Sequence, residues 1–228
     1  CQRPQGTAPN RKLGKPNVFD NKNPLCQPGA QTALTEEALR ADYYARIPND
    51  FYRNSIPWTD LIGGRDQEPT RHYDSFGTTL TYWPLKIERA PWLDQFQRRF
   101  CLHHPDRVRI GLIQGQGLLL PHRDHDVGAT LNIYLAADPN DITCFYRPKQ
   151  AEVQAQRAPG AATANVYVPS DLVEVGQFTA QTGDCCLLNS QQIHSVRMRG
   201  PRTRILLSLM WSQRSYQEVL ADLADYAS

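Results

Sequence analysis

Two histidines and an aspartate form the set of side chains in this sequence that could hold a metal ion. His122 and Asp124 are separated by one residue, and side chains two apart on a β-strand point to the same face. His194 follows 70 residues after Asp124, in another strand-like segment, and completes two imidazoles and one carboxylate. Three ligands on one face of an octahedral ion leave its other positions open. An H-x-D triplet also occurs in polar turns, and His125 and Asp126 offer competing ligands, but the shared strand parity favours His122 and Asp124.

Arg204 is the fourth residue of this group. It lies ten residues after His194 and begins the apolar run 204–211, whose sequence is RILLSLMW. A cation that enters an apolar strand is costly unless it meets an anion, and a planar guanidinium binds a carboxylate through two parallel hydrogen bonds. If His194 binds a metal, Arg204 can bind the far end of a dicarboxylate that chelates this metal. The alternative is a surface arginine on an edge strand.

The segments that must position these residues have the character of short β-strands. From residue 108 onward, apolar or alternating runs are separated by turn signals at roughly 8–12-residue spacing, a pattern typical of a sandwich or barrel. We expect strands at 108–113, 118–122, 130–135, 143–146, 166–168, 172–175, 177–179, 185–188, 193–196 and 204–211. The sequence therefore predicts a mainly β fold with flanking helices.

The chain is expected to form one domain behind an irregular arm. Residues 1–31 are rich in Pro, Asn, Gln and Gly without periodicity, and residues 32–228 would form the domain. Apolar stripes predict helices at 35–47, where Leu39, Tyr43 and Ile47 recur, and at 92–100 and 216–226. A short strand is expected at 78–83. The expected parts of the domain are a helical and aromatic part at 32–107, a β core at 108–215 and a C-terminal helix at 216–228.

Composition restricts the classes of partner. The 228 residues carry 25 Lys and Arg against 23 Asp and Glu, and a net charge of +2 gives no electrostatic reason to expect nucleic acid or a membrane surface as a partner. No apolar run reaches the ~18 residues of a membrane span, and no signal peptide is expected. The six cysteines lack C-x-x-C spacing, so we expect reduced thiols in a cytoplasmic protein, with Cys185 and Cys186 in the core.

The run from His122 to Trp211 resembles the Fe(II)/2-oxoglutarate-dependent dioxygenases. That family carries H-x-D/E, a distal histidine and an arginine about ten residues later on a double-stranded β-helix (jelly-roll, cupin-like) core, and the layout looks like its aspartyl/asparaginyl β-hydroxylase and proline hydroxylase branch. About half of the chain matches, at 109–113, 121–122, 130–135, 183–184, 189–190, 194–196 and 204–211. The resemblance implies Fe(II) bound by His122, Asp124 and His194, with 2-oxoglutarate and O2 consumed and succinate and CO2 released.

The resemblance also implies a co-substrate pocket around Arg204, which would bind the C5 carboxylate of 2-oxoglutarate. Asn132 shares one face of its strand with Thr130 and Tyr134, and we expect it to help hold the co-substrate. Many relatives carry Arg-x-Ser, whereas this chain has Leu206 at that position and Ser208 two residues further on. Ser208 is therefore expected in a pocket that departs from the family pattern.

The expected substrate is a small polar molecule such as an amino acid, hydroxylated at an unactivated C–H bond. Arg109 begins the strand before the metal residues and could bind a substrate carboxylate or phosphate, or be a surface charge. Trp211 is expected in the core or in the pocket wall, where it would contact substrate. A protein side chain, a nucleobase and a natural product are left open as substrates. Two alternatives also stay open: a cupin-type metal enzyme that does not use 2-oxoglutarate, and a non-catalytic jelly-roll binding module.

Overall fold

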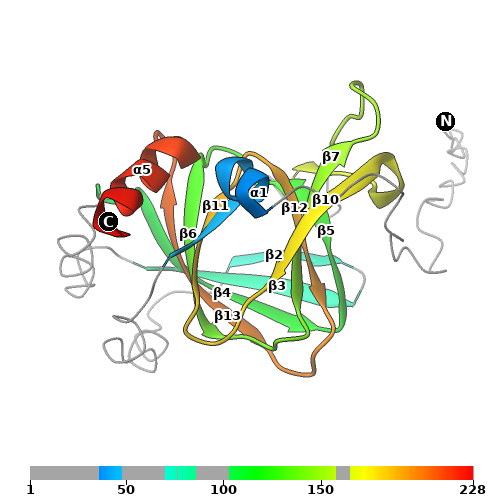
Figure 1. The fold of residues 1–228 in the computed structure, drawn as a ribbon. Helices are drawn as coiled ribbons and strands as arrows, with labels where there is room; N and C mark the ends of the chain where they lie inside the picture. The colour runs from blue at the N-terminus through cyan, green and yellow to red at the C-terminus, as the bar shows by residue number, and fades with distance from the viewer. Residues whose placement is uncertain (1–35, 48–69, 76, 86–102, 158–164, 228) are drawn as a thin grey trace, which may run out of the picture.

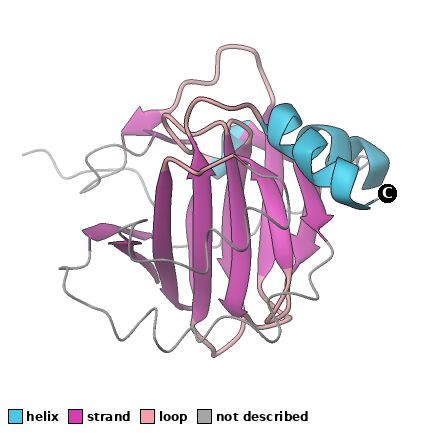
Figure 2. Cartoon of the chain, turned by 90° about the vertical axis from the view of Figure 1, so that its left-hand side faces the viewer, coloured by secondary structure: helices cyan, strands magenta, loops and turns pink. Residues whose placement is uncertain are grey.

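Two antiparallel sheets face each other across the interior of the protein (Figures 1 and 2). The structure is a computed structural model that describes residues 36–47, 70–75, 77–85, 103–157 and 165–227. In spatial order, the larger sheet consists of β1 (Tyr44–Ile47), β11 (Cys185–Asn189), β6 (Ala129–Ala136), β13 (Arg204–Trp211), β4 (Arg107–Gly115), β3 (Thr78–Leu85) and β2 (Thr70–Ser75). The smaller sheet consists of β10 (Leu172–Thr179), β7 (Ile142–Pro148), β12 (Ile193–Met198), β5 (Gly117–Arg123), β9 (Asn165–Val166) and β8 (Gln156–Arg157).

The chain winds between the two sheets as a double-stranded β-helix. Eight strands alternate so that the larger sheet contains the order β4-β13-β6-β11 and the smaller sheet the order β5-β12-β7-β10. In each set of four strands, the first in the sequence pairs with the last: β4 with β13, and β5 with β12. The two remaining strands of each set also pair, β6 with β11 and β7 with β10, which is the arrangement of a jelly roll. This confirms the predicted fold class, mainly β with a jelly-roll core.

Alternation along each strand divides the larger sheet into two apolar faces. On β13 the even-numbered residues point into the space between the sheets, where Leu206 packs with Tyr134 and Phe145. The odd-numbered residues, such as Leu207 and Leu209, point outward and pack under helix α5 (Tyr216–Ala227). Since Arg204 and Ser208 are even-numbered, the fold directs both polar side chains into the interior.

Helix α5 agrees with the helix expected at 216–226, but the helix expected at 35–47 is shorter than predicted. Helix α1 spans Glu36–Asp42, and Tyr44–Ile47 forms strand β1 instead. The apolar stripe expected on this helix is buried in part, at Leu39 and Tyr43. Pairing of Tyr44–Ile47 with the exposed edge of β11 supplies backbone hydrogen bonds that a longer helix would not satisfy there. The arm at 1–31 and the helix expected at 92–100 lie outside the described residues.

Most expected strands are present, but two of them are joined into one and a third is shortened. The segments 172–175 and 177–179 form one strand, β10, with a bulge between Glu174 and Gly176. The strand expected at 166–168 is reduced to β9, and a single 3-10 turn over Pro169–Asp171 follows it. The strand expected at 78–83 is β3 and extends to Leu85. Local patterns therefore placed strand positions well and strand ends less well.

The β4–β5 connection requires glycine. Gly115 has a φ of +95°, and a Cβ atom at this position would lie 2.0 Å from the carbonyl oxygen of Gly77. This tight turn carries the chain from the larger sheet to the smaller one and so brings β5, which bears His122, across the interior from β4.

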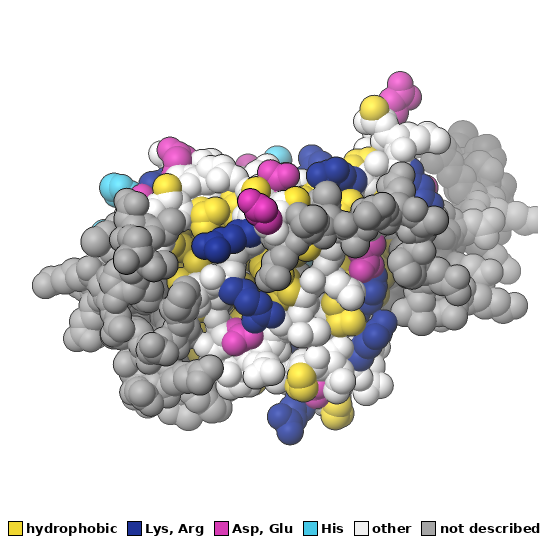
Figure 3. All heavy atoms as spheres, in the orientation of Figure 1, with side chains coloured by type: hydrophobic (Ala, Val, Ile, Leu, Met, Phe, Trp, Pro, Cys, Tyr) yellow, Lys and Arg dark blue, Asp and Glu magenta, His cyan; other side chains and the backbone are white. Residues whose placement is uncertain are grey.

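The surface agrees with the balanced composition. Basic, acidic and apolar side chains are interspersed over the described surface visible in Figure 3. None of the helices within the described residues has the length and apolar character needed to cross a membrane.

Candidate metal centre

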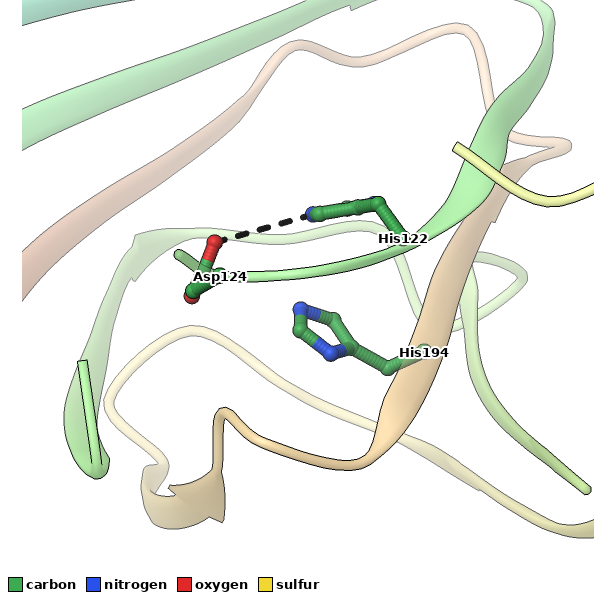
Figure 4. Close-up of side chains that lie close together, drawn as sticks. All are labelled: His122, Asp124 and His194. Atoms are coloured by element: carbon green, nitrogen blue, oxygen red, sulfur yellow. Dashed lines mark ion pairs between the residues drawn. The ribbon is translucent and has the colours of Figure 1, made fainter. Parts of the chain in front are cut away.

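The structure brings His122, Asp124 and His194 together inside the smaller sheet. His122 is near the end of β5, His194 is the second residue of β12, and the two are directly opposite in the register of these neighbouring strands. One possible ligand atom of each residue lies within 4.8 Å of those of the other two. The Nε2 atom of His122 is 3.8 Å from an oxygen of Asp124, and the three side chains point toward one another (Figure 4).

Asp124 differs from the expectation in one respect. It follows the last residue of β5, so it lies in the loop and not on the strand with His122. The loop still directs its carboxylate to the histidines, because the backbone N–H of Asp124 donates to the carbonyl oxygen of Ser190 at 3.0 Å. The side chain of Gln191 donates to the carbonyl oxygens of Val127, at 2.5 Å, and of Asp124, at 3.3 Å. These bonds fix the loop to the segment that leads into β12.

Backbone carbonyl oxygens engage the Nδ1 atoms of both imidazoles. The Nδ1 atom of His122 lies 2.8 Å from the carbonyl oxygen of Leu120, and that of His194 lies 2.9 Å from the carbonyl oxygen of Gln192. A carbonyl oxygen only accepts, so each Nδ1 carries the proton and donates it. In the neutral rings each Nε2 then presents a lone pair toward the cluster, as in metal-binding histidines oriented by a backbone carbonyl.

Hydroxyl groups hold the carboxylate of Asp124. The hydroxyl of Ser190 bonds to this carboxylate and lies 2.6 Å from the hydroxyl of Thr130. Both hydroxyl residues are buried. A serine hydroxyl that donates to Asp124 can accept from Thr130, so the two form a relay from β6 to the carboxylate.

Asp124 is held as an anion. Burial raises the pKa of its carboxyl group, but His194, His122, Arg109 and the bond from Ser190 together outweigh burial and lower this pKa below its usual value. Its side chain is 21% exposed, against 9% for His122, so the cluster opens to solvent on the aspartate side. A charged, partly accessible carboxylate beside two imidazole lone pairs is a donor set suited to a divalent metal ion.

Arg204 lies in the interior with no anionic partner among the described residues. It is 2% exposed, and its Nη2 group donates to the hydroxyls of Tyr134, at 3.0 Å, and Thr143, at 2.8 Å. Its Nε is buried and has no hydrogen-bond partner within the described part of the chain. Thr143 lies two residues before Phe145 on β7, and Phe145 is directly opposite His194. Residues directly opposite one another on neighbouring strands form a row across the sheet. The guanidinium therefore contacts the row next to the one that contains the two histidines.

Asn132 and Ser208 lie on the same interior face but bond to each other. The Ser208 hydroxyl donates to the Asn132 side-chain oxygen at 2.6 Å, and both residues are buried. Arg109 extends this row, since Ser208 is directly opposite Arg109 on β4 and Asn132 on β6. The structure thus groups Asn132 and Ser208 with Arg109, four residues along the strands from Arg204.

Trp211 does not line this interior. It is 1% exposed, packs in the outer cluster beneath α5, and donates its indole N–H to the carbonyl oxygen of His103 at 2.9 Å. Trp211 therefore lies in the core, which is one of its two expected positions, and a contact with substrate stays untested. The strand parity of β13 explains this, because odd-numbered residues point away from the metal centre.

Four polar residues of the site were not singled out from the sequence. Tyr134 and Thr130 share the face of Asn132, so the parity of their strand was the signal that could have identified them. Ser190 lies in the segment 189–190 that matches the resembling family, but no role was assigned to it, and Thr143 had no such signal because its contact depends on the pairing of distant strands.

Solved structures with a similar fold exist, although no protein-family model and no curated protein matches the sequence. The epimerase SnoN, in complex with Fe3+, alpha ketoglutarate and nogalamycin RO, is 16% identical over 75% of this chain and 79% of its own, with a TM-score of 0.47. A 2OG-Fe(II) oxygenase family oxidoreductase from Burkholderia pseudomallei is 14% identical over 78% and 89%, with a TM-score of 0.47. HygX from Streptomyces hygroscopicus, with nickel and 2-oxoglutarate bound, is 17% identical over 77% and 86%, with a TM-score of 0.45. At these identities and TM-scores the likeness decides nothing about this chain, and its fold and chemistry rest on its own strands and residues.

Proposed function

We propose that this protein is an Fe(II)- and 2-oxoglutarate-dependent oxygenase that hydroxylates a small polar molecule such as an amino acid. The observation that carries the proposal is a buried arginine without a carboxylate partner among the described residues, one strand row away from a cluster of two histidines and one aspartate. The cluster provides a metal site with open positions. The arginine provides a site for a second, anionic ligand of the same metal.

The residues fit Fe(II). His122 and His194 would bind the ion through their Nε2 atoms, because both Nδ1 atoms are engaged by backbone carbonyls. Asp124 would add the carboxylate. Two imidazoles and one carboxylate on one face of the ion are the ligand set of non-haem Fe(II) oxygenases, with the remaining positions left for co-substrate and oxygen.

The residues fit 2-oxoglutarate as well. Two residues along a strand correspond to about 7 Å, which a five-carbon dicarboxylate can bridge from the histidine row to the row of Thr143. The far carboxylate would accept hydrogen bonds from the Arg204 guanidinium and would satisfy its unpaired Nε. Tyr134 and Thr143 hold the guanidinium in place, so little ordering is needed when the carboxylate binds.

When bound, the iron and 2-oxoglutarate would supply the oxidation of a substrate C–H bond by O2, with one oxygen atom going to the product hydroxyl and the other to succinate, and with release of CO2. The protein's own groups set the conditions for this chemistry. The Ser190 hydroxyl orients the Asp124 carboxylate. The apolar side chains of Leu206 and Phe145 exclude water from the space between the Arg204 and histidine rows.

The proposal is tested by adding Fe(II) and then 2-oxoglutarate to the protein without oxygen and recording visible absorption. We expect a charge-transfer band that needs both additions and is abolished in His122→Ala, Asp124→Ala and His194→Ala. His125→Ala is the matched control, because this imidazole is 67% exposed and outside the cluster. Succinate release with a panel of amino acids then identifies the substrate.

The other functions predict different results. A cupin-type enzyme that does not use 2-oxoglutarate would bind metal through the same three residues without developing the band. A non-catalytic binding module would bind neither. Either outcome, with folded protein and with His125→Ala behaving as wild type, would refute the oxygenase proposal.

A further inference from the structure

Arg109 occupies the interior row beyond the metal centre, at the opposite end of the sheet from Arg204. Both residues lie on strands of the larger sheet, and Arg204 is directly opposite Ile113, four residues from Arg109 along β4. Four residues along a strand correspond to about 13 Å. Arg109 is thus placed to bind an anion different from the carboxylate that Arg204 would hold.

Tyr82 fixes the Arg109 guanidinium. The central carbon of the guanidinium lies 3.6 Å from the centre of the Tyr82 ring, a stacked contact that leaves the edges of the guanidinium free to donate. Burial raises the pKa of Tyr82, although Arg109 opposes this, so the phenol is neutral at physiological pH and does not neutralise the arginine.

Arg109 has no acidic partner among the described residues, unlike other partly buried arginines of the protein. Arg197 pairs with Glu174 and Arg214 with Asp222. No carboxylate of the described residues lies within ion-pair distance of Arg109, and its Nε is buried without a hydrogen-bond partner. A buried N–H without an acceptor is costly, which indicates an acceptor from outside the described residues, and a bound anion is an acceptor of this kind.

The position of Arg109 relates it to the metal centre. Its row contains Asn132, and the neighbouring residue on that face of β6 is Thr130, which bonds to Ser190 and through it to Asp124. Arg109 is also close enough to Asp124 for its charge to lower the pKa of that carboxyl group. An anion bound by Arg109 would therefore lie on the open, aspartate side of the metal centre.

We propose that Arg109, stacked on Tyr82, binds a carboxylate of the substrate, so that the substrate is a small carboxylic acid oxidised at a carbon near this group. The inference rests on the proposed oxygenase function and adds the chemical class of its substrate. The guanidinium edge left free by Tyr82 can bind the two oxygens of a carboxylate through parallel hydrogen bonds, and the phosphorylated analogues in the test below distinguish a carboxylate from a phosphate. The row partners Ser208 and Asn132 are neutral hydrogen-bonding groups.

The test uses matched acids and amides with protein loaded with Fe(II) and 2-oxoglutarate in the absence of oxygen. The probes are the L-amino acids, their primary amides, and the phosphate monoesters of the corresponding amino alcohols, in which a phosphate replaces the carboxylate. Their dissociation constants are measured by calorimetry. We expect at least one acid to bind roughly tenfold or more tightly than its amide. In Arg109→Gln the affinity for the acid should fall by about 30-fold, the loss typical of truncating one partner of a buried charge pair, while affinity for the amide is unchanged.

Two further variants complete the experiment. Arg109→Lys keeps the charge without the planar fork, so its preference for the acid should lie between those of wild type and Arg109→Gln. Arg202→Gln removes one positive charge from an exposed turn and should bind acids and amides as wild type does. If Arg109→Gln does not fold, Arg109→Lys still tests the inference, because an unchanged preference for the acid in that variant refutes a bidentate role.

Several results would overturn the inference. These are equal binding of acids and amides by wild type, tighter binding of the phosphorylated analogues, binding of neither series, and an acid preference retained in Arg109→Gln. A variant that loses Fe(II) affinity and weakens acids and amides equally would show that Arg109 only supports Asp124. The visible band of the iron and 2-oxoglutarate complex is recorded on the same samples, so its absence indicates failure of the proposed function, and its presence without an acid preference indicates failure of this inference alone.

Discussion

Replacement of Arg204 by methionine should separate binding of 2-oxoglutarate from stability of the fold. The substitution removes a guanidinium that is 2% exposed and keeps most of the side-chain volume. Truncating one partner of a buried, hydrogen-bonded charge pair costs about 2–5 kcal/mol. The dissociation constant for 2-oxoglutarate should therefore rise by ~30-fold to several thousand-fold, since each 1.4 kcal/mol is about a factor of ten.

The same substitution should change the stability of the ligand-free protein much less. A buried guanidinium without a carboxylate partner is itself unfavourable, and an apolar side chain of similar volume relieves this cost. The hydroxyls of Tyr134 and Thr143 lose a donor and oppose the gain, at about 1–3 kcal/mol for each group left unsatisfied. We expect the two effects to offset each other, so that the free energy of unfolding stays within about 2 kcal/mol of wild type.

Two measurements test this reasoning. Anaerobic titration of 2-oxoglutarate into the Fe(II)-loaded variant gives the affinity, and urea unfolding of the ligand-free variant gives the stability. Leu206→Ala is the control, because Leu206 is on the same face two residues further and its truncation should cost about 2–5 kcal/mol of stability. An Arg204→Met protein that binds 2-oxoglutarate normally, or that is destabilised as much as Leu206→Ala, would refute the assignment of Arg204 as a co-substrate residue.

Three further predictions follow from the contacts of the site and core. In a Fe(II) titration, Ser190→Ala should weaken Fe(II) binding by roughly tenfold or more, because the hydroxyl orients Asp124. Ser195→Ala is the control, because it removes an equally buried hydroxyl that bonds to a tyrosine on the outer face, and it should leave metal affinity unchanged. Burial raises the pKa of the Cys144 and Cys186 thiols to about 12, so these thiols lose their protons at lower pH in the unfolded chain than in the folded protein. The free energy of unfolding should therefore fall as pH rises above about 9. In urea titrations, Cys144→Ala should reduce this pH dependence. For the same reason iodoacetamide at pH 8 should leave both thiols unmodified until the protein is unfolded, and modification of the folded protein, seen by peptide mass spectrometry, would contradict their burial.

Several features could be predicted because they depend on local pattern. Strand β13 has the bounds expected from its apolar run, and its parity correctly directs Arg204 and Ser208 to one face. The spacing of His122 and Asp124 indicated that both side chains would meet, and the structure brings them together with His194, although Asp124 reaches the cluster from the loop after β5 and not from the strand. Periodicity and residue type carry this information because side chains alternate strictly along an extended chain.

Other features could not be predicted because they depend on pairing between distant segments. The helix expected at 35–47 ends early because an edge of β11, about 140 residues away, pairs with Tyr44–Ile47. The contact of Arg204 with Thr143 exists only after β7 and β13 face each other from opposite sheets. Trp211 was expected in the pocket wall or the core; its parity on β13 directs it away from Arg204, and α5 supplies the side chains that cover it.

The order of the polar groups along the interior bears on which carbon of a substrate the site would oxidise. Arg204 contacts the row of Thr143, the histidines occupy the next row, and Asp124 connects through Ser190 to the far rows of β6, beside Arg109. A dicarboxylate held at one end and a substrate carboxylate held at the other would therefore approach the metal from different sides. Under this arrangement the separation between the Arg109 guanidinium and the metal selects which substrate carbon is attacked, since a rigid anchor fixes one reactive geometry. Shortening that anchor to lysine should then shift the position of hydroxylation as well as lower the affinity, an outcome that a purely electrostatic role for Arg109 does not predict.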